Sequence, residues 1–104
     1  MNRGEIWTFE FKHPDKTRPV LILTRQEIIP YLDTVTVVPI TRTIRSVPSE
    51  VLVGIDEGLK ETSAINLHHL VTISKSNLHR FLGSISPNKM NHVLAAMLFA
   101  LGFE

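Results

Sequence analysis

Arginine and threonine side chains gather at two places in the sequence, each beside an apolar run. Arg18 follows the polar segment 12–17 and precedes the run Val20–Leu23. The second group follows the β-branched run Thr34–Ile40 and consists of Thr41, Arg42, Thr43 and Arg45. Guanidinium groups match phosphate oxygens in a planar, bidentate manner, and a threonine hydroxyl can hydrogen-bond a non-bridging oxygen. These residue types suit the binding and cleavage of a phosphodiester.

The two groups would meet if the apolar runs are neighbouring strands. Pro19–Leu23 and Thr34–Ile40 are predicted as strands, and Pro39 predicts that pairing is interrupted or at an edge there. In an antiparallel pair the start of one strand lies beside the end of its neighbour, which puts Arg18 near Thr41. The flanking loops would add Arg42, Arg45, Lys16 and His13. An RNA substrate supplies its own nucleophile, the 2′-OH, so that no metal is needed.

The histidines do not form a metal-binding pattern. His68 and His69 are adjacent on a predicted strand and therefore point to opposite faces. The sequence has no H-x-x-x-H motif, glycine-rich phosphate loop, nucleophile elbow or cysteine, and we predict no metal and no cofactor. A net charge of +1 requires any nucleic-acid surface to be local. With no secretory h-region and no apolar run of ~20 residues, we expect a cytoplasmic protein with no membrane partner.

Residues 1–104 are expected to form a single domain, mainly β with one helix. The strand Glu5–Phe11 alternates, with Trp7, Phe9 and Phe11 predicted to face the core. Residues 64–72 are predicted as one strand and residues 49–53 and 81–85 as shorter strands. Residues 25–32 are ambiguous, and residues 26–29 could form a short helical turn that Pro30 would end. Gly83 predicts a bulge or a close backbone approach. The expected fold is a small, strongly bent antiparallel sheet or barrel of about five to seven strands with a C-terminal helix.

The helix has the clearest local signals. Ser86 is a capping residue, Pro87 suits the first helical position, and Gly102 is placed to end the helix. Apolar residues at helical spacing predict its buried stripe: Met90, Val93, Leu94, Met97, Leu98 and Leu101. Ala95, Phe99 and Ala100 make the flank apolar as well, which predicts burial from more than one side and hence a homodimer.

Several segments in a fixed order carry a family resemblance: Arg-Gly-Glu-Ile-Trp near the start, Arg18–Leu23, Thr36–Thr41, Gly58–Lys60, Val71–Ile73 before Lys75, and a final helix that ends in Leu101-Gly102. Over nearly its whole length the chain resembles the MazF/PemK family of toxin endoribonucleases. The resemblance implies an SH3-like barrel with a helix, usually a homodimer. It also implies sequence-specific, metal-independent cleavage of single-stranded RNA and inhibition by a cognate antitoxin with an acidic, partly disordered tail.

Residue by residue, the resemblance assigns the catalytic roles to Arg18 and Thr41. The 2′-OH would attack the adjacent phosphorus and leave a 2′,3′-cyclic phosphate and a 5′-hydroxyl. The expected RNA-binding residues are His13, Lys16, Thr17, Arg42, Thr43, Arg45, His68 and His69. The chain departs from many members in its shorter loop 12–17, and in having His68-His69 where they carry an acidic residue followed by an amide.

Three alternatives fit parts of the same pattern. Arg18 could be a surface arginine paired with Asp15 or Glu10, and Thr41 could simply end a strand. A non-catalytic barrel that binds a protein target, as gyrase-poisoning toxins are thought to do, would need no such pair. A single-strand nucleic-acid-binding module would need exposed aromatic side chains for stacking, whereas the aromatic residues of the first strand are predicted to be buried.

Overall fold

The computed structural model describes residues 1–10 and 17–103. Within these residues the strands are β1 (Glu5–Glu10), β2 (Thr17–Ile22), β3 (Thr34–Thr41), β4 (Glu50–Val53), β5 (Ser63–Asn66), β6 (Val71–Ser74) and β7 (Leu78–Ser84). The helix α1 (Pro87–Leu101) follows them, and short 3-10 helices span Gln26–Tyr31, Ile55–Glu57, Leu67–His69 and Lys75–Asn77. β2 begins earlier than expected, so that Arg18 lies within a strand and pairs with Phe9 of β1.

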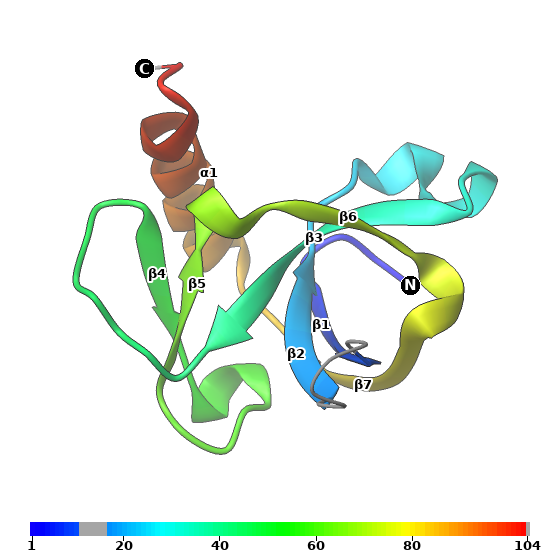
Figure 1. Ribbon diagram of the computed structural model, residues 1–104, viewed down its shortest axis with the longest axis horizontal. Helices are drawn as coiled ribbons and strands as arrows, with labels where there is room; N and C mark the ends of the chain where they lie inside the picture. The colour runs from blue at the N-terminus through cyan, green and yellow to red at the C-terminus, as the bar shows by residue number, and fades with distance from the viewer. Residues whose placement is uncertain (11–16, 104) are drawn as a thin grey trace.

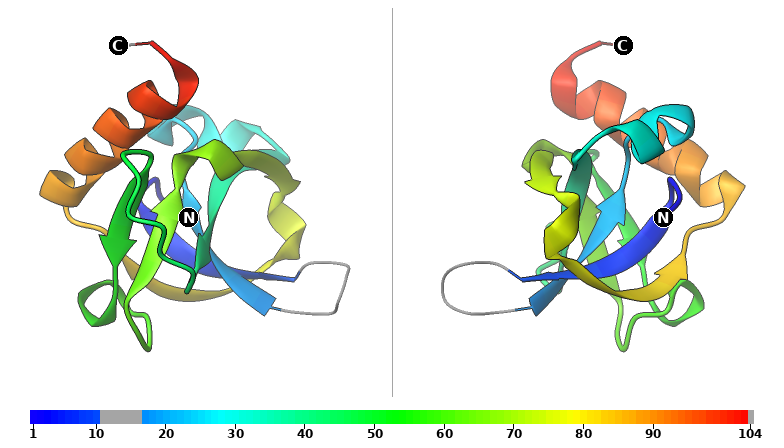
Figure 2. Two further views of the ribbon diagram at one scale, coloured as in Figure 1. Left: turned by 60° about the vertical axis from the view of Figure 1, so that its left-hand side comes forward. Right: turned by 90° about the vertical axis from the view of Figure 1, so that its right-hand side faces the viewer.

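The seven strands form one curled antiparallel sheet, a half-barrel with the helix at one side (Figure 1). The strand order is β4-β5-β3-β2-β1-β7, and β6 pairs with the first half of β3. Figure 2 shows α1 running alongside β4 and β5, away from the start of β2. This architecture confirms the predicted small bent sheet with a C-terminal helix.

β3 changes partner along one edge, and Pro39 lies at the change. Thr34–Val37 pair with β6, whereas Ile40 and Thr41 pair with β5. Pro39 falls between the two partners on that edge, while on the other edge it lies opposite Val20 of β2. The interruption predicted at Pro39 is therefore present, because a residue without an N–H fits where the ladder on one side is broken.

The sheet is packed on both faces. One apolar cluster includes Ile6, Leu21 and Val38 and lies under the helix residues Val93 and Ala96. The other lies on the opposite face and consists of Phe9, Val20, Ile22, Ile29, Val35, Val37 and Ile73. The one-sided prediction for the first strand was therefore wrong, because Ile6 and Thr8 are buried as well as Phe9, while Trp7 is only half-buried; Phe11 lies outside the described residues.

The strand predicted over residues 64–72 is broken in the middle. Asn66 Oδ1 accepts hydrogen bonds from the backbone N–H of His68 and from Ser49 Oγ, both at 3.1 Å. These bonds turn Leu67–His69 into a 3-10 helix, after which the chain resumes as β6 on a different part of β3. His68 and His69 consequently do not lie on the two faces of a strand.

The helix ends form as predicted, but only part of the predicted stripe is buried in this single chain. Ser86 Oγ accepts from the Lys89 N–H at 3.0 Å, and Gly102 takes a left-handed φ of +76°. The fully buried helix residues are Val93 and Ala96, while Leu94 and Leu101 are each 49% exposed. Leu94 and Leu101 belong to the predicted stripe, which was expected to lie on one face of the barrel or on a second subunit, and they remain largely uncovered in this single chain.

A loop after β4 closes the half-barrel against β7. The loop backbone at Glu57 and Gly58 lies directly against the β7 backbone at Gly83. A Cβ on Gly83 would be only 2.2 Å from the carbonyl oxygen of Glu57. The buried Glu57 fixes this loop, since its Oε1 accepts from the Gly54 N–H and its Oε2 lies 3.2 Å from Lys89 Nζ of α1. The sequence prediction of a close approach at Gly83 is confirmed.

A hydrogen-bonded carboxylate stabilises the start of β1. Glu5 Oε1 accepts from Trp7 Nε1 and from the Asn2 backbone N–H, each at 2.9 Å. Burial by itself raises the pKa of Glu5, but the hydrogen bonds from Trp7 and Asn2 favour the carboxylate more strongly. The pKa of Glu5 is therefore lower than its ordinary value of 4.5.

Candidate functional site

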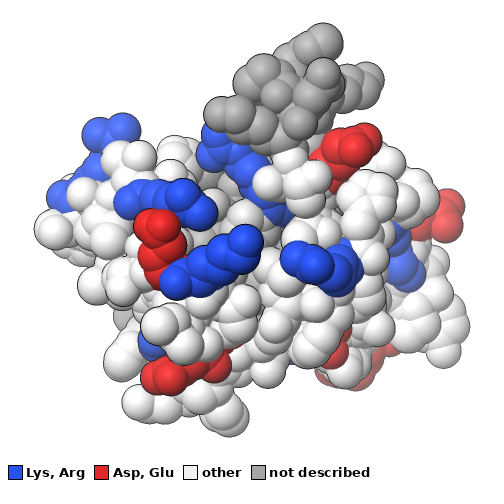
Figure 3. All heavy atoms as spheres, turned by 90° about the horizontal axis from the view of Figure 1, so that it is seen from below, with Lys and Arg blue, Asp and Glu red and all other residues white. Residues whose placement is uncertain are grey.

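A groove of about 880 Å³ lies at the end of the half-barrel where β2 begins and β3 ends. Its wall combines strand ends with the loop after β4: Thr8, Thr17, Arg18, Pro19, Ile40, Thr41, Arg42, Thr43, Gly58, Leu59, Lys60, Glu61, Ser63, Arg80 and Leu82. Figure 3 shows Lys and Arg side chains gathered across the middle of this face of the molecule. The groove is therefore open, polar at its rim and cationic.

Arg18 and Thr41 both line this groove, as the strand pairing predicted. Arg18 is the second residue of β2 and is exposed, while Thr41 is the last residue of β3 and is half-buried. Thr41 Oγ1 accepts from the Thr43 N–H at 3.1 Å, which holds the hydroxyl oxygen and leaves its proton available to a ligand. Two donors of the kind that bind phosphate oxygens thus converge in one cavity.

Three further expected RNA-binding residues line the same groove: Thr17, Arg42 and Thr43. Arg42 Nη1 lies 3.5 Å from Glu61 Oε2, and both side chains are exposed to solvent. Solvent screening makes such a pair weak, so a phosphate can compete for the guanidinium.

The remaining expected contacts do not line the groove in this single chain. Arg45 is exposed, with its backbone N–H donating to the Glu50 carboxylate. His68 and His69 follow β5, whereas Thr41 pairs with Ala64 near the beginning of β5, so the histidines lie at the other end of that strand. His13 and Lys16 lie outside the described residues.

Several groove residues were missed by the sequence reading: Thr8, Lys60, Glu61, Ser63 and Arg80. Lys60 and Glu61 belong to a loop that was interpreted only as a connection. Arg80 belongs to a strand whose predicted start, residue 81, was too late. Gly83 was the one feature of the sequence that could have indicated these residues. The close backbone approach predicted at Gly83 brings the loop that carries Lys60 and Glu61 against β7, the strand that carries Arg80.

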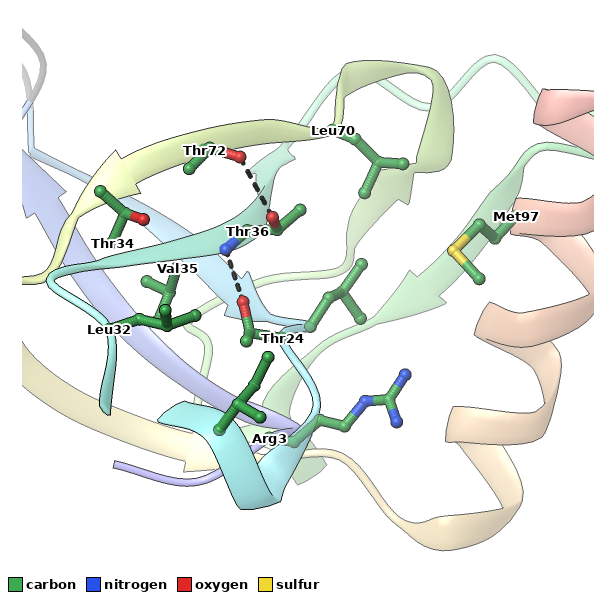
Figure 4. Close-up of a pocket in the computed structure, with 11 residues that line it drawn as sticks. Arg3, Thr24, Leu32, Thr34, Val35, Thr36, Leu70, Thr72 and Met97 are labelled. Atoms are coloured by element: carbon green, nitrogen blue, oxygen red, sulfur yellow. Dashed lines mark hydrogen bonds between the residues drawn. The ribbon is translucent and has the colours of Figure 1, made fainter. Parts of the chain in front are cut away.

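A second, smaller pocket of about 340 Å³ has a different character (Figure 4). Its wall is mostly apolar, with Leu32, Val35, Leu70 and Met97 among its side chains and Arg3 as its only charged one among the described residues. Three of its four threonine hydroxyls are already engaged, since Thr24 Oγ1 accepts from the Thr36 N–H at 2.7 Å and Thr36 and Thr72 share a hydrogen bond at 3.1 Å. It does not present a reactive constellation.

The part of the chain that the structure describes contains no cluster of metal-binding side chains. No three His, Cys, Asp or Glu side chains of residues 1–10 and 17–103 come together to hold an ion. The same residues include no helix with the length and hydrophobicity to cross a lipid bilayer.

The family model described as "PemK-like, MazF-like toxin of type II toxin-antitoxin system" matches residues 2–101. The chain belongs to the PemK/MazF toxin family. Among its relatives, the endoribonuclease MazF3 of Mycobacterium tuberculosis is 45% identical over 69 residues, which cover 66% of this chain and 67% of MazF3. The probable endoribonuclease MazF5 of the same species is 35% identical over 101 residues, 95% of this chain and 91% of MazF5.

Solved structures agree with this assignment to the PemK/MazF family. The Mycobacterium tuberculosis toxin MazF-mt6 superimposes with a TM-score of 0.88 at 34% identity, covering 94% of this chain and 96% of the toxin. A mycobacterial endoribonuclease solved in complex with its cognate antitoxin gives a TM-score of 0.90 at 27% identity, covering 100% of this chain and 97% of that one. The chain therefore has the fold of these two toxin structures over most of the length of each.

Proposed function

We propose that this PemK/MazF-family protein is a toxin endoribonuclease that cleaves single-stranded RNA at specific sequences without a metal. The observation that supports this proposal most directly is that Arg18 and Thr41 line one open cationic groove. The curated relatives with which the chain shares 45% and 35% identity are named as endoribonucleases. Family membership and groove geometry therefore point to the same activity.

In the proposed reaction the 2′-oxygen of the RNA attacks the adjacent phosphorus, and the bond from phosphorus to the 5′-oxygen breaks. The 2′-hydroxyl loses its proton and the leaving 5′-oxygen gains one, which gives a 2′,3′-cyclic phosphate and a 5′-hydroxyl. Arg18 stabilises the negative charge that develops on the non-bridging oxygens, since a guanidinium remains protonated. The Thr41 hydroxyl donates a hydrogen bond to a non-bridging phosphate oxygen and thereby orients the phosphate. The other proposed RNA contacts are His13, Lys16, Thr17, Arg42, Thr43, Arg45, His68 and His69.

The partners we propose are an antitoxin and a second copy of the chain. An acidic antitoxin segment would compete with RNA for the guanidinium groups of the groove. Leu94 and Leu101 of α1 are each 49% exposed, and Phe103, just after the helix, is 77% exposed, so this end of the chain offers apolar surface to a second copy. Light scattering at micromolar concentration should give a dimer mass, and a monomer mass would contradict the second partner. We propose the cytoplasm, where the RNA substrate is found, as the place of action.

The decisive experiment is single-turnover cleavage of a long RNA in EDTA, followed by analysis of the ends. We expect cyclic phosphate and 5′-hydroxyl ends with the wild-type protein. Arg18→Ala should reduce the rate by at least ~10²–10³, Arg18→Lys should recover part of it, and Thr41→Ala should be milder. Arg25→Ala is the matched control, because Arg25 is an exposed arginine beside Glu27 that does not line the groove.

The melting temperatures of the same variants distinguish a loss of catalysis from a loss of folding. Arg18 is exposed, so its loss should hardly change the melting temperature. Wild-type cleavage by Arg18→Ala would contradict the assigned site. RNA binding without any cleavage by the wild-type protein would instead support the alternative of a single-strand-binding module.

A further inference from the structure

β7 carries an irregularity directly opposite β1 at the groove. Phe9 pairs with Leu78 and Trp7 pairs with Phe81, so that two residues of β7, His79 and Arg80, stand opposite the single residue Thr8. This two-against-one arrangement is a β-bulge. Bulges are common next to functional sites because they turn a side chain away from the direction that regular pairing would give it.

The bulge is fixed by a side chain of the neighbouring strand. The backbone N–H of Arg80 donates to Thr8 Oγ1 at 3.0 Å, and Thr8 is 9% exposed. On the other side of the bulge, Phe81 packs edge-to-face on Trp7 with ring centroids 6.0 Å apart. Arg80 lines the groove with Thr8 and Leu82, whereas Phe81 does not line it. The bulge therefore presents an arginine to the groove at a defined backbone position.

The charge of Arg80 is available for a ligand. Arg42 is the groove arginine with an acidic neighbour, Glu61. No carboxylate of residues 1–10 and 17–103 lies within ion-pair distance of Arg80 or Arg18. A guanidinium on a polar groove wall without such a neighbour is suited to an RNA phosphate, because it can donate two parallel hydrogen bonds to the phosphate oxygens.

Arg80 and Arg18 come from different strands of the groove wall. β1 lies between β7 and β2 in the sheet, so the two backbones are about 10 Å apart at the usual strand spacing. We propose that Arg80 binds an RNA phosphate that flanks the scissile one and thereby positions the strand on Arg18 and Thr41. This inference rests on the proposed endoribonuclease function and assigns Arg80 to binding, without a part in the chemical step.

The first test measures binding without cleavage. An oligonucleotide spanning a mapped cleavage site, with a 2′-deoxy sugar at the cleaved position, lacks the nucleophile and can be titrated across salt concentrations. Arg80→Gln should weaken its binding about tenfold and reduce the slope of log K against log salt by about 0.7. Arg80→Lys should keep the slope with partial affinity, and the matched control Arg25→Gln should leave both unchanged. Unchanged affinity and slope in Arg80→Gln would overturn the proposal.

The second test identifies the phosphate. Each phosphate of the oligonucleotide is replaced in turn by a neutral methylphosphonate, and binding is measured for the wild type and for Arg80→Gln. Replacing one phosphate that flanks the cleaved one should weaken binding by the wild type. The same replacement should not weaken binding by Arg80→Gln any further, as expected if Arg80 contacts that phosphate directly. Equal losses in both proteins at every position would overturn the proposal.

Cleavage kinetics separate this inference from the proposed function. Arg80→Gln should raise KM about tenfold and leave kcat near the wild-type value. Wild-type protein that cleaves no RNA would remove the proposed function itself. If the wild-type protein cleaves RNA and Arg80→Gln has the same KM as the wild type, only the role of Arg80 is overturned.

Discussion

Replacing Gly83 by alanine should disturb the closure of the half-barrel, because the backbone of the loop after β4 occupies the space that the added Cβ needs. The added Cβ would lie 2.2 Å from the Glu57 carbonyl oxygen, 2.8 Å from its carbon and 3.3 Å from Gly58 Cα. Ordinary contact begins near 3.4 Å, so the loop must move by about 1 Å. All three obstructing atoms are backbone atoms, and no side-chain rotation can relieve the contact.

We expect Gly83→Ala to lower the free energy of unfolding by about 1–3 kcal/mol, the usual cost of overpacking. For a domain of this size that corresponds to a melting temperature lower by about 5–15 °C. The displaced loop also carries Leu59 and Lys60 of the groove, so the affinity for RNA should fall as well. Urea unfolding and KM for RNA cleavage measure the two effects.

Gly102→Ala is the control for glycine replacement in general. Gly102 has a φ of +76°, but a Cβ there would meet no atom within 4 Å. Its replacement should cost about 1 kcal/mol from backbone strain alone and leave KM unchanged. The reasoning about the loop contact would be refuted if Gly83→Ala melted like the wild type, or if it matched Gly102→Ala in both measurements.

Three further predictions concern stability. Glu57→Gln should lower the free energy of unfolding in urea by about 1–2 kcal/mol, because the hydrogen bond from Gly54 and the contact with Lys89 lose their charge; an unchanged urea midpoint would contradict this. Ser86→Ala should cost about 1 kcal/mol through the lost helix cap, seen as a lower melting temperature, whereas Ser84→Ala, outside the helix, should not. The stability difference between wild type and Glu5→Gln should be complete above pH 4.5 and vanish as the pH falls through the lowered pKa of Glu5; a difference that grows in acid would be inconsistent with that pKa.

Local signals in the sequence were sufficient for the helix and for the central pair of strands. Ser86, Pro87 and Gly102 act within one helical turn of where they stand, so their effect can be read without knowing the fold. The meeting of Arg18 and Thr41 needed one further assumption, that their strands are antiparallel neighbours. Register then brings the two residues to the same rim.

The features that were missed depend on partners distant in the sequence. The break after Asn66 is stabilised by Ser49, and the bulge at Arg80 is stabilised by Thr8. Neither of these hydrogen bonds can be recognised from the residues next to it in the sequence. Residues 64–72 therefore looked like one continuous strand, and Arg80 was not recognised as part of the groove wall. The hydrophobic pattern of the helix likewise does not reveal which of its residues pack on the sheet, because close packing favours the small Ala96 there, whereas Leu94 stays exposed in the single chain.

The packing of the sheet on both of its faces has a consequence for how such toxins can diversify. Strand interiors such as those of β2 and β3 touch an apolar cluster on either side, so most substitutions there should be eliminated by their effect on folding. The groove is built instead from strand ends, one bulge and one loop, and its exposed side chains, such as Arg18, Arg42 and Thr43, can change with little effect on stability. Selection on RNA target choice can therefore act on the rim while the interior stays fixed, and related toxins can acquire new cleavage sequences without a new fold.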